Sequence, residues 1–288
     1  ARPDDKKELP PCIVRKHDGA ALYATSDLAT LIEREKDYHP GHVIYVVDKR
    51  QELHFTQVFR VAKMTGIVGE DTPLTFIGFG TMNGTDGKPF KTRDGGVMRL
   101  EMLISDVSEK VYEKILENRD ISEEEAREIS KIIGLAAIKY GDLSNQATKD
   151  YVFDIDRFTS FEGNTGPYIL YTIVRIKSIL KKYAEQGNEL SENGKIVDFG
   201  SESERSLKLV LTQFNDVMEA SYNELAPHRV CAYIYEVANA FNRFYHENNI
   251  MNEENADKQK SYINLLTLTK KVLEQCIDLL AIDAPERM

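Results

Sequence analysis

The sequence of 288 residues has only three cysteines and no apolar run near the roughly 20 residues needed to cross a bilayer. Its opening segment, residues 2–8, is polar and mixed in charge, so it has no signal-peptide pattern. Cys12, Cys231 and Cys276 lie at spacings that indicate neither a disulfide framework nor a metal site. These absences argue against membrane-spanning and disulfide-stabilised secreted classes and favour a cytoplasmic protein with reduced thiols.

The chain also has fewer basic than acidic residues. The 37 Lys and Arg residues against 47 Asp and Glu residues give a formal net charge of -10 at pH 7, which argues mildly against nucleic-acid binding. This value averages the whole chain, and acidic runs lie at 123–125 and 253–257. One short stretch gathers four basic residues: Arg175, Lys177, Lys181 and Lys182. A segregated basic face is therefore compatible with the sequence.

Strand and helix patterns alternate in the first third of the chain. We expect strands at 21–25, 43–48 and 74–80, with helices at about 26–35 and 51–65 between them. A strand, a helix and a strand at this spacing predict a right-handed parallel crossover. About three strands are too few for a complete doubly wound domain, so the pattern indicates part of a Rossmann-like domain.

Helical periodicity dominates the rest. Ser122 begins one helix with a capping-box pattern, and Pro167 begins another at a favoured first-turn position. The longer helices are expected at about 167–183, 202–224, 227–246 and 257–282. Helices in series of this kind predict a bundle.

Two lysines, Lys88 and Lys91, lie three residues apart in a Gly-rich loop at 84–96. Lysines on such a loop can close on a polyphosphate and neutralise charge that develops on the leaving group, although a solvated surface turn is the alternative. With Thr92, the loop resembles the Lys-Met-Ser-Lys-Ser signature of class I aminoacyl-tRNA synthetases, in the form found in arginyl-tRNA synthetases. Pro89 departs from that signature but leaves both lysines in place.

The signature loop normally works with a His-x-Gly-His motif, and His39-Pro40-Gly41-His42 matches it letter for letter. In the family that motif opens a helix, whose N-terminus helps to bind phosphate. Here it precedes a strand-like run at 43–47, so we interpret it as a turn. No further ligand cluster supports a metal site at these histidines.

Residues 18–29 resemble a signature of arginyl-tRNA synthetases in which Tyr23 and Asp27 match the residues that hold the substrate side chain. A carboxylate pairs well with a planar guanidinium that is always charged, and a phenol hydroxyl fixes its orientation. From the residues alone, Asp27 as a helix cap and Tyr23 as a packing residue are the simpler interpretations.

Residues 45–55 resemble the same family. The resemblance implies that Gln51 contacts the substrate arginine and that His54 lies near ATP, together with Lys88 and Lys91. Gln51 and His54 follow the strand expected at 43–48, and ligands bind at strand C-termini in open α/β sheets. A polar residue partly covered by packing is the alternative for His54.

Residues 160–171 resemble the entry to the helical anticodon-binding domain of arginyl-tRNA synthetases, where Tyr168 and Tyr171 match anticodon-contacting positions. Aromatic rings one helical turn apart suit stacking on unstacked bases, whereas a tyrosine core stripe is the alternative. The remaining residues expected at this site are Arg175, Asn239, Arg243 and Met288.

The resemblance extends in order along the chain and implies the C-terminal half to two-thirds of an arginyl-tRNA synthetase. It places part of the α/β Rossmann-like catalytic domain at 1–118, a connecting helical segment at 119–155 and an all-α anticodon-binding bundle at 156–288. Such an enzyme joins arginine to tRNA using ATP and Mg²⁺. We expect a monomer that contacts no membrane and binds no metal of its own.

The first Rossmann half is not visible in this sequence, so the chain alone is expected to be inactive. Two alternatives remain. One is a non-catalytic tRNA-binding module, and the other is a different class I aminoacyl-tRNA synthetase, such as a cysteine enzyme. Tyr23, Asp27 and Gln51 argue against the second alternative, because they suit a cationic side chain.

Overall fold

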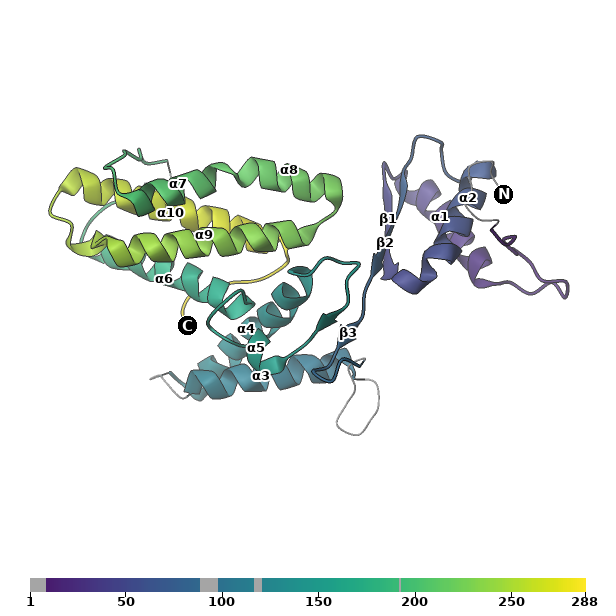
Figure 1. The fold of residues 1–288 in the computed structure, drawn as a ribbon, viewed down its shortest axis with the longest axis horizontal. Helices are drawn as coiled ribbons and strands as arrows, with labels where there is room; N and C mark the ends of the chain where they lie inside the picture. Colours follow the sequence, from purple (N-terminus) through teal and green to yellow (C-terminus); the bar gives the residue numbers. More distant parts are fainter. Residues whose placement is uncertain (1–8, 89–97, 117–120, 192) are drawn as a thin grey trace. The chain divides into compact units, whose positions relative to one another are not determined.

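The computed structural model describes residues 9–88, 98–116, 121–191 and 193–288, which form two compact units (Figure 1). The first unit comprises the described residues up to Thr81 together with Ala147–Tyr151. The second comprises the described residues of Met82–Gln146 and Val152–Met288. The domain limits at 118 and 155 come from the family resemblance of the sequence, and they stay a prediction.

The first unit is built on the parallel crossover expected from the sequence. Its elements are helix α1 (Tyr23–Tyr38), strand β1 (Val43–Asp48), the 3-10 turn η1 (Lys49–Gln51), helix α2 (Glu52–Met64) and strand β2 (Leu74–Phe79). The strands pair in parallel from Val43 opposite Leu74 to Asp48 opposite Phe79. The predictions of both strands and of α2 are therefore confirmed.

Both helices of this unit lie on one side of the two strands (Figure 1). Val43 and Tyr45 of β1 face the helices and join a core that includes Leu28 of α1 and Val58 of α2. The alternate residues point the other way, and Val46 is 60% exposed. The period-2 pattern of a strand thus produces one packed face, which holds α1 against α2.

The expected strand at 21–25 is wrong, because α1 already begins at Tyr23. The Thr25 hydroxyl accepts a hydrogen bond from the Leu22 N–H at 2.9 Å, which caps the helix three residues earlier than the sequence suggested. Ala21 makes only an isolated bridge with Arg15. In the described part of the chain, the parallel sheet therefore has two strands instead of about three.

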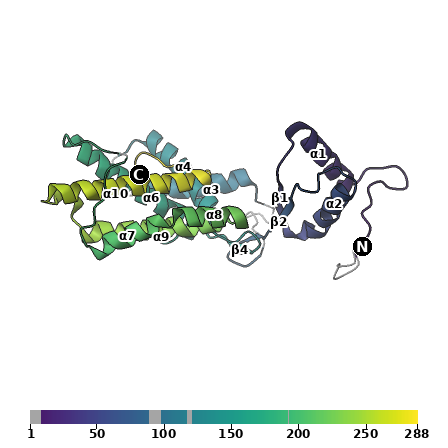
Figure 2. The ribbon, with the colours of Figure 1, turned by 90° about the horizontal axis from the view of Figure 1, so that it is seen from above.

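The second unit is helical (Figure 2). Its helices are α3 (Leu100–Leu116), α4 (Glu123–Leu143), α5 (Ile155–Phe158), α6 (Gly166–Glu185), α7 (Glu202–Thr212), α8 (Phe214–Glu224), α9 (Pro227–Glu247) and α10 (Ala256–Leu279), with a 3-10 turn η2 (Ile250–Asn252). Two short strands, β3 (Met82–Asn83) and β4 (Tyr151–Val152), pair with each other. The bundle prediction is confirmed, although α3 was not among the helices expected from the sequence.

Helix starts in this unit follow the expected capping chemistry. The Ser122 hydroxyl accepts from the Glu125 N–H at 3.3 Å at the start of α4. The Thr165 hydroxyl accepts from the Tyr168 N–H at 3.2 Å at the start of α6, where Pro167 occupies the first turn. These caps satisfy backbone donors that a helix leaves unpaired, so they fix where α4 and α6 begin.

The single helix expected at 202–224 is interrupted at Gln213, which separates α7 from α8. The Thr212 hydroxyl donates to the Leu209 carbonyl at 2.7 Å, and such side-chain bonds compete with the helical backbone ladder. Both helices pack along α9 (Figure 2). Because the helix is interrupted at Gln213, α7 and α8 can both pack against α9.

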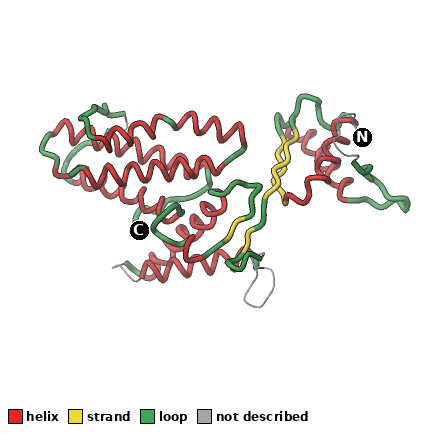
Figure 3. The backbone as a smooth tube through the Cα atoms, viewed as in Figure 1, coloured by secondary structure: helices red, strands yellow, loops and turns green. Residues whose placement is uncertain are grey.

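One continuous core joins α4, α6, α9 and α10, and regular structure in this unit is almost entirely helical (Figure 3). At its centre, the buried Tyr140 hydroxyl lies 2.8 Å from the Cys231 carbonyl and 2.7 Å from Asn164 Oδ1. A Cβ atom at Gly166 would lie 2.5 Å from the Ala136 carbonyl oxygen. The first turn of α6 therefore rests directly on the backbone of α4.

None of the helices in the described ranges is long and apolar enough to cross a membrane. Cys12, Cys231 and Cys276 are free thiols in the structure. Burial raises the pKa of Cys231 and that of Cys276 to about 12. These two thiols therefore behave as core residues.

Candidate functional site

Asp27 and His54, which are far apart in the sequence, meet where α1 packs against α2. The His54 Nε2 atom lies 2.5 Å from Asp27 Oδ2, and the two side chains are 27% and 29% exposed. Asp27 is the fifth residue of α1, so its interpretation as a helix cap is wrong. The pair combines a carboxylate with a histidine at a position that solvent can reach.

Tyr23 lies on α1 with Asp27, and Gln51 lies in η1, directly before the helix α2 that carries His54. Tyr23 lies one turn before Asp27 and is 86% exposed. Gln51 ends η1, three residues before His54, and is also exposed. The structure thus brings the three predicted arginine-binding residues and His54 onto two adjacent helix starts, with contact between Asp27 and His54.

The loop after β1 is held by charge pairs that the sequence did not reveal. Asp48 accepts hydrogen bonds from the backbone N–H of Arg50 at 2.8 Å and from its guanidinium at 2.6 and 2.9 Å, which holds the Asp48 pKa at about 2. Lys49 Nζ lies 2.7 Å from Asp150 Oδ1 and, with donors on Thr81, holds the Asp150 pKa at about 2. These contacts fix the turn that carries Gln51.

Tyr45, which is partly buried, and the buried Phe55 form an aromatic group near the Asp27–His54 pair. The Tyr45 ring lies 4.7 Å from that of Phe55, and the Arg34 guanidinium lies 5.4 Å from the Tyr45 ring centroid. Burial raises the pKa of Tyr45, and the nearby Arg34 lowers it only in part. The phenol therefore stays neutral at physiological pH.

The His39-Pro40-Gly41-His42 segment forms the predicted turn. His39 ends α1 in the left-handed region, with φ of 44°, and β1 begins directly afterwards at Val43. The His42 ring lies 2.8 Å from the Thr75 hydroxyl. This segment stands at the amino end of β1, whereas ligands of parallel sheets bind at the carboxyl end.

Lys88 is exposed in a tight turn that follows β3. Its N–H donates to Asp86 Oδ1 at 3.0 Å, and its carbonyl accepts from the Gly84 N–H at 2.8 Å. Lys91 and Thr92, the other members of the predicted phosphate loop, lie outside the described residues. Over the described ranges, no group of three or more His, Cys, Asp or Glu side chains is arranged to hold a metal ion.

In the second unit, a chain of hydrogen bonds connects the predicted anticodon residues of α6 and α9. The Tyr168 hydroxyl donates to Asn239 Oδ1 at 2.8 Å and accepts from Asn242 Nδ2 at 2.8 Å. Asn242 Oδ1 accepts in turn from Arg175 Nη1 at 2.9 Å. Asn242 was not among the residues expected from the sequence, although it lies three positions after Asn239 on α9, where a helix places residues on one face.

Arg175 is held between two tyrosine rings. Its guanidinium carbon lies 4.6 Å from the centroid of Tyr171 and 5.5 Å from that of Tyr245. Arg243 precedes Tyr245 by two residues on α9, and it pairs with Glu247 at 2.9 Å and with Glu202 at 3.7 Å. Arg175 thus forms part of an ordered cation–aromatic group, whereas Arg243 is already engaged by acidic neighbours.

The C-terminal residue Met288 lines a cavity of about 350 Å³ together with Tyr171 and Phe161. Lys177 anchors the preceding segment through Glu286 at 2.7 Å and is only 16% exposed. Arg287 pairs with Glu125 of α4. Of the four basic residues at 175–182, Lys177 is therefore already paired with an acidic residue of the same chain, so the four do not form one open basic face.

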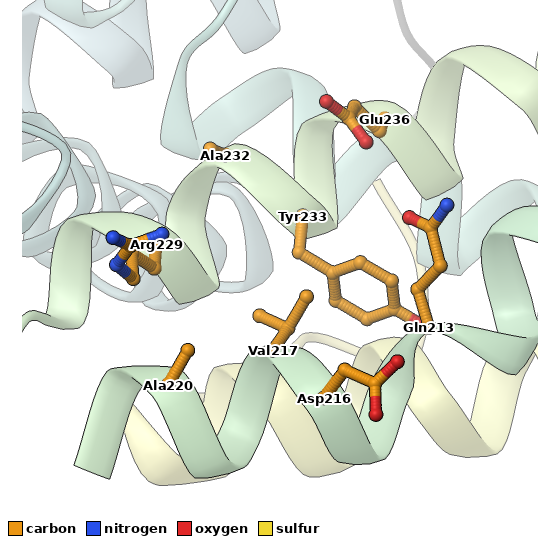
Figure 4. A pocket seen from close by; sticks show the side chains of 8 residues that line it. All are labelled: Gln213, Asp216, Val217, Ala220, Arg229, Ala232, Tyr233 and Glu236. Atoms are coloured by element: carbon orange, nitrogen blue, oxygen red, sulfur yellow. The ribbon is translucent and has the colours of Figure 1, made fainter. Parts of the chain in front are cut away.

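A second cavity, of about 450 Å³, lies between α8 and α9 (Figure 4). The Tyr233 ring extends from α9 toward α8 and lies near Val217 (Figure 4). Asp216 of α8 and Glu236 of α9 also line the cavity. None of the residues predicted as functional lines this cavity.

Comparison with known families gives two matches in chain order. Residues 4–155 match the model of tRNA synthetases class I (R), catalytic domain. Residues 169–288 match the model of the DALR anticodon binding domain. The two matches have the same order as the partial Rossmann-like domain and the bundle inferred from the sequence.

Curated relatives are described as arginine–tRNA ligases. The chain is 59% identical to that of Agathobacter rectalis and 60% identical to that of Alkaliphilus oremlandii, and it covers 49% of each. It aligns with the arginyl-tRNA synthetase structure of Plasmodium falciparum at a TM-score of 0.77 and 27% identity, covering 96% of this chain and 46% of that one. The Thermus thermophilus structure shares the fold at a TM-score of 0.76 and 20% identity, covering 96% of this chain and 50% of that one. The chain thus spans about half the length of its curated relatives.

Proposed function

Because this chain belongs to the class I arginyl-tRNA synthetases, we propose that it supplies part of the arginine site and the anticodon-binding surface of an arginine–tRNA ligase. That reaction activates arginine with ATP as an arginyl-adenylate and transfers it to tRNA. We propose a cytoplasmic monomer that uses Mg²⁺ together with ATP. The curated relatives named above are described as arginine–tRNA ligases, which argues against the cysteine-enzyme alternative, whereas the tRNA-binding module remains an alternative for the isolated chain.

The observation that carries the arginine role is the Asp27 carboxylate at the junction of α1 and α2. It is 29% exposed, so a ligand can reach it, and it is partly withdrawn from solvent, which strengthens an ion pair. A guanidinium donates two parallel N–H groups to such a carboxylate. Tyr23 would orient the bound side chain with its hydroxyl, and Gln51 would add an amide contact from the neighbouring helix.

Lys88, Lys91 and Thr92 would act on the phosphates of ATP. Loss of pyrophosphate places negative charge on the leaving group, and cations that are already in position stabilise it most in the transition state. Mg²⁺ would be held mainly by the phosphates, as is common for this small ion. The nucleotide role of His54 stays a prediction, and its contact in the described structure is Asp27.

Anticodon binding would use Tyr168, Tyr171 and Arg175 on α6. Tyrosine rings stack on unstacked bases, and a guanidinium pairs with phosphate or stacks on a base plane. The remaining proposed contacts are Asn239, Arg243 and Met288. Arg175 is already oriented by Tyr171 and Asn242, so little side-chain freedom would be lost on binding RNA.

Arginine-dependent exchange of pyrophosphate into ATP, measured with added tRNA, tests the activity. We expect no exchange by the chain alone, because it spans half the length of its relatives and its described sheet has two strands. The Agathobacter rectalis ligase is the positive control. Exchange at the level of that enzyme would contradict the expectation that another part of the catalytic domain is required.

Arginine binding, measured by NMR titration, tests Asp27 directly. Asp27→Asn keeps the size and removes the charge, and loss of a desolvated charge partner costs about 2–5 kcal/mol. Because Asp27 is partly exposed, we expect the lower end, which corresponds to roughly 30-fold weaker binding. Asp37→Asn, at an exposed position near the end of α1, is the matched control. Equal affinity for Asp27→Asn and the parent chain would remove Asp27 from the site.

A further inference from the structure

We propose that His54 is a positioning residue for the Asp27 carboxylate and makes arginine binding depend on pH. This inference rests on the proposed function, because it takes Asp27 as the partner of the substrate guanidinium. Its basis is the contact between Asp27 Oδ2 and His54 Nε2 at 2.5 Å, which joins α1 to α2. The resemblance implied a nucleotide role for His54 and gave no reason to pair these residues.

The geometry leaves Asp27 able to accept a second partner. An ionised carboxylate has two oxygens and about four lone-pair sites, of which His54 occupies one on Oδ2. Within the described ranges, no side chain or backbone group donates to Oδ1. The His54 ring is itself oriented by an edge contact with Phe55, at a centroid distance of 5.0 Å. His54 therefore holds Oδ2 of the Asp27 carboxylate and leaves positions open for a guanidinium.

The protonation state of His54 decides whether this arrangement favours a cation. A neutral imidazole donates one N–H to Asp27 and brings no charge. A protonated imidazole places a positive charge beside the carboxylate, where it neutralises Asp27 and repels an incoming guanidinium. Histidine is the side chain whose ordinary charge change falls between pH 5 and 8. Arginine and the proton on His54 therefore compete.

The other side chains near Asp27 and His54 do not provide a comparable change of charge with pH. On α1, Arg34 lies over the Tyr45 ring, and on β1 burial raises the pKa of Tyr45, which keeps this phenol neutral across the range. Gln51 and Phe55, which neighbour His54 on its own segment, do not titrate. Histidine is thus the residue type in this described cluster that ordinarily changes charge between pH 5 and 8.

Calorimetric titration of the chain with L-arginine at pH 5.5 and 8.0 tests the proposal. We expect about tenfold tighter binding at pH 8.0, the scale of two like charges several ångströms apart in a partly solvated site. By linkage, binding at pH 5.5 should release protons, which appears as a heat that depends on the buffer.

Three variants separate positioning from a merely structural role. His54→Gln keeps an N–H donor without the titratable charge, so affinity at pH 8.0 should stay within about threefold of the parent and lose its pH dependence. His54→Ala removes the donor and should weaken binding at pH 8.0 about fivefold or more. His42→Gln changes an exposed histidine at the other end of β1 and should leave the pH dependence intact.

The outcomes distinguish this inference from the proposed function. Equal arginine affinity at the two pH values, or a pH dependence that survives in His54→Gln, overturns the role of His54 and leaves the arginine site standing. Absence of arginine binding by the parent chain at both pH values overturns the arginine site, and the role of His54 with it. If His54→Ala unfolds, as circular dichroism would detect, the His54→Gln comparison still decides.

Discussion

The Tyr168 hydroxyl offers a way to separate a base-stacking tyrosine from a core tyrosine. Tyr168→Phe removes the bond donated to Asn239 and the bond accepted from Asn242, each 2.8 Å long. A hydrogen bond contributes about 0.5–1.5 kcal/mol net, and once released the exposed Asn239 amide and the partly buried Asn242 amide can turn to water. We therefore expect a loss of about 1 kcal/mol in the free energy of unfolding, with the aromatic face still available.

Tyr168→Leu removes the ring as well. Stacking of a base on an aromatic side chain contributes about 1–3 kcal/mol. The ring is half-buried and meets Tyr235 at a centroid distance of 5.8 Å, so only part of it can face a base. The lower half of that range, about 1.5 kcal/mol, corresponds to roughly tenfold weaker RNA binding. Tyr168→Phe should lose far less affinity.

The assay is a titration with an arginine-accepting tRNA and an anticodon-swapped variant at one fixed salt concentration, because phosphate contacts make affinity depend on salt. Tyr222→Leu is the matched control, since Tyr222 is 78% exposed on α8 and takes no part in the hydrogen-bonded group. If Tyr168→Leu binds both tRNAs as tightly as the parent does, Tyr168 is a core residue. Equal binding of the two tRNAs by the parent contradicts anticodon reading by this domain.

Two further predictions follow from charge and burial. Lys49 lowers the folded pKa of Asp150 to about 2, below an unfolded value of about 3.9, so Asp150→Asn should lower the melting temperature above about pH 4, with the difference vanishing toward pH 2. A difference that persists at pH 2 would contradict the ion pair. A thiol reagent at pH 8 should modify half-buried Cys12 first, and Cys231 and Cys276 only after unfolding, as thiol counts with and without denaturant would reveal.

Much of the fold could be predicted because its signals are local. Val43–Asp48 and Leu74–Phe79 are short apolar runs separated by an amphipathic helix, which is sufficient to predict a parallel crossover. The start of α1 was missed because apolar residues near position 22 suggested a strand, whereas Thr25 caps a helix there. The interruption at Gln213 was missed because the helical sequence pattern is continuous there, whereas the Thr212 hydroxyl bond to the Leu209 carbonyl competes with the backbone ladder.

The candidate sites were predictable as single residues but less so as groups. Similarity to a family identified Asp27 and His54 separately, yet their contact depends on how α1 packs against α2. The spacing of Tyr168 and Tyr171 indicated a shared helix face. The place of Arg175 between Tyr171 and Tyr245 depends on α9 lying beside α6, which no local pattern specifies.

The close approach of Gly166 to the Ala136 carbonyl limits which amino-acid substitutions the helical unit can accept at that position. A side-chain contact can be replaced by another pair of similar volume, but a backbone oxygen 2.5 Å from the site of a would-be Cβ atom cannot be exchanged by mutation. At the start of α6 the main chains of α6 and α4 therefore meet with no side chain between them. Substitutions can accumulate in the surrounding core while Tyr168, two residues further on, keeps its position.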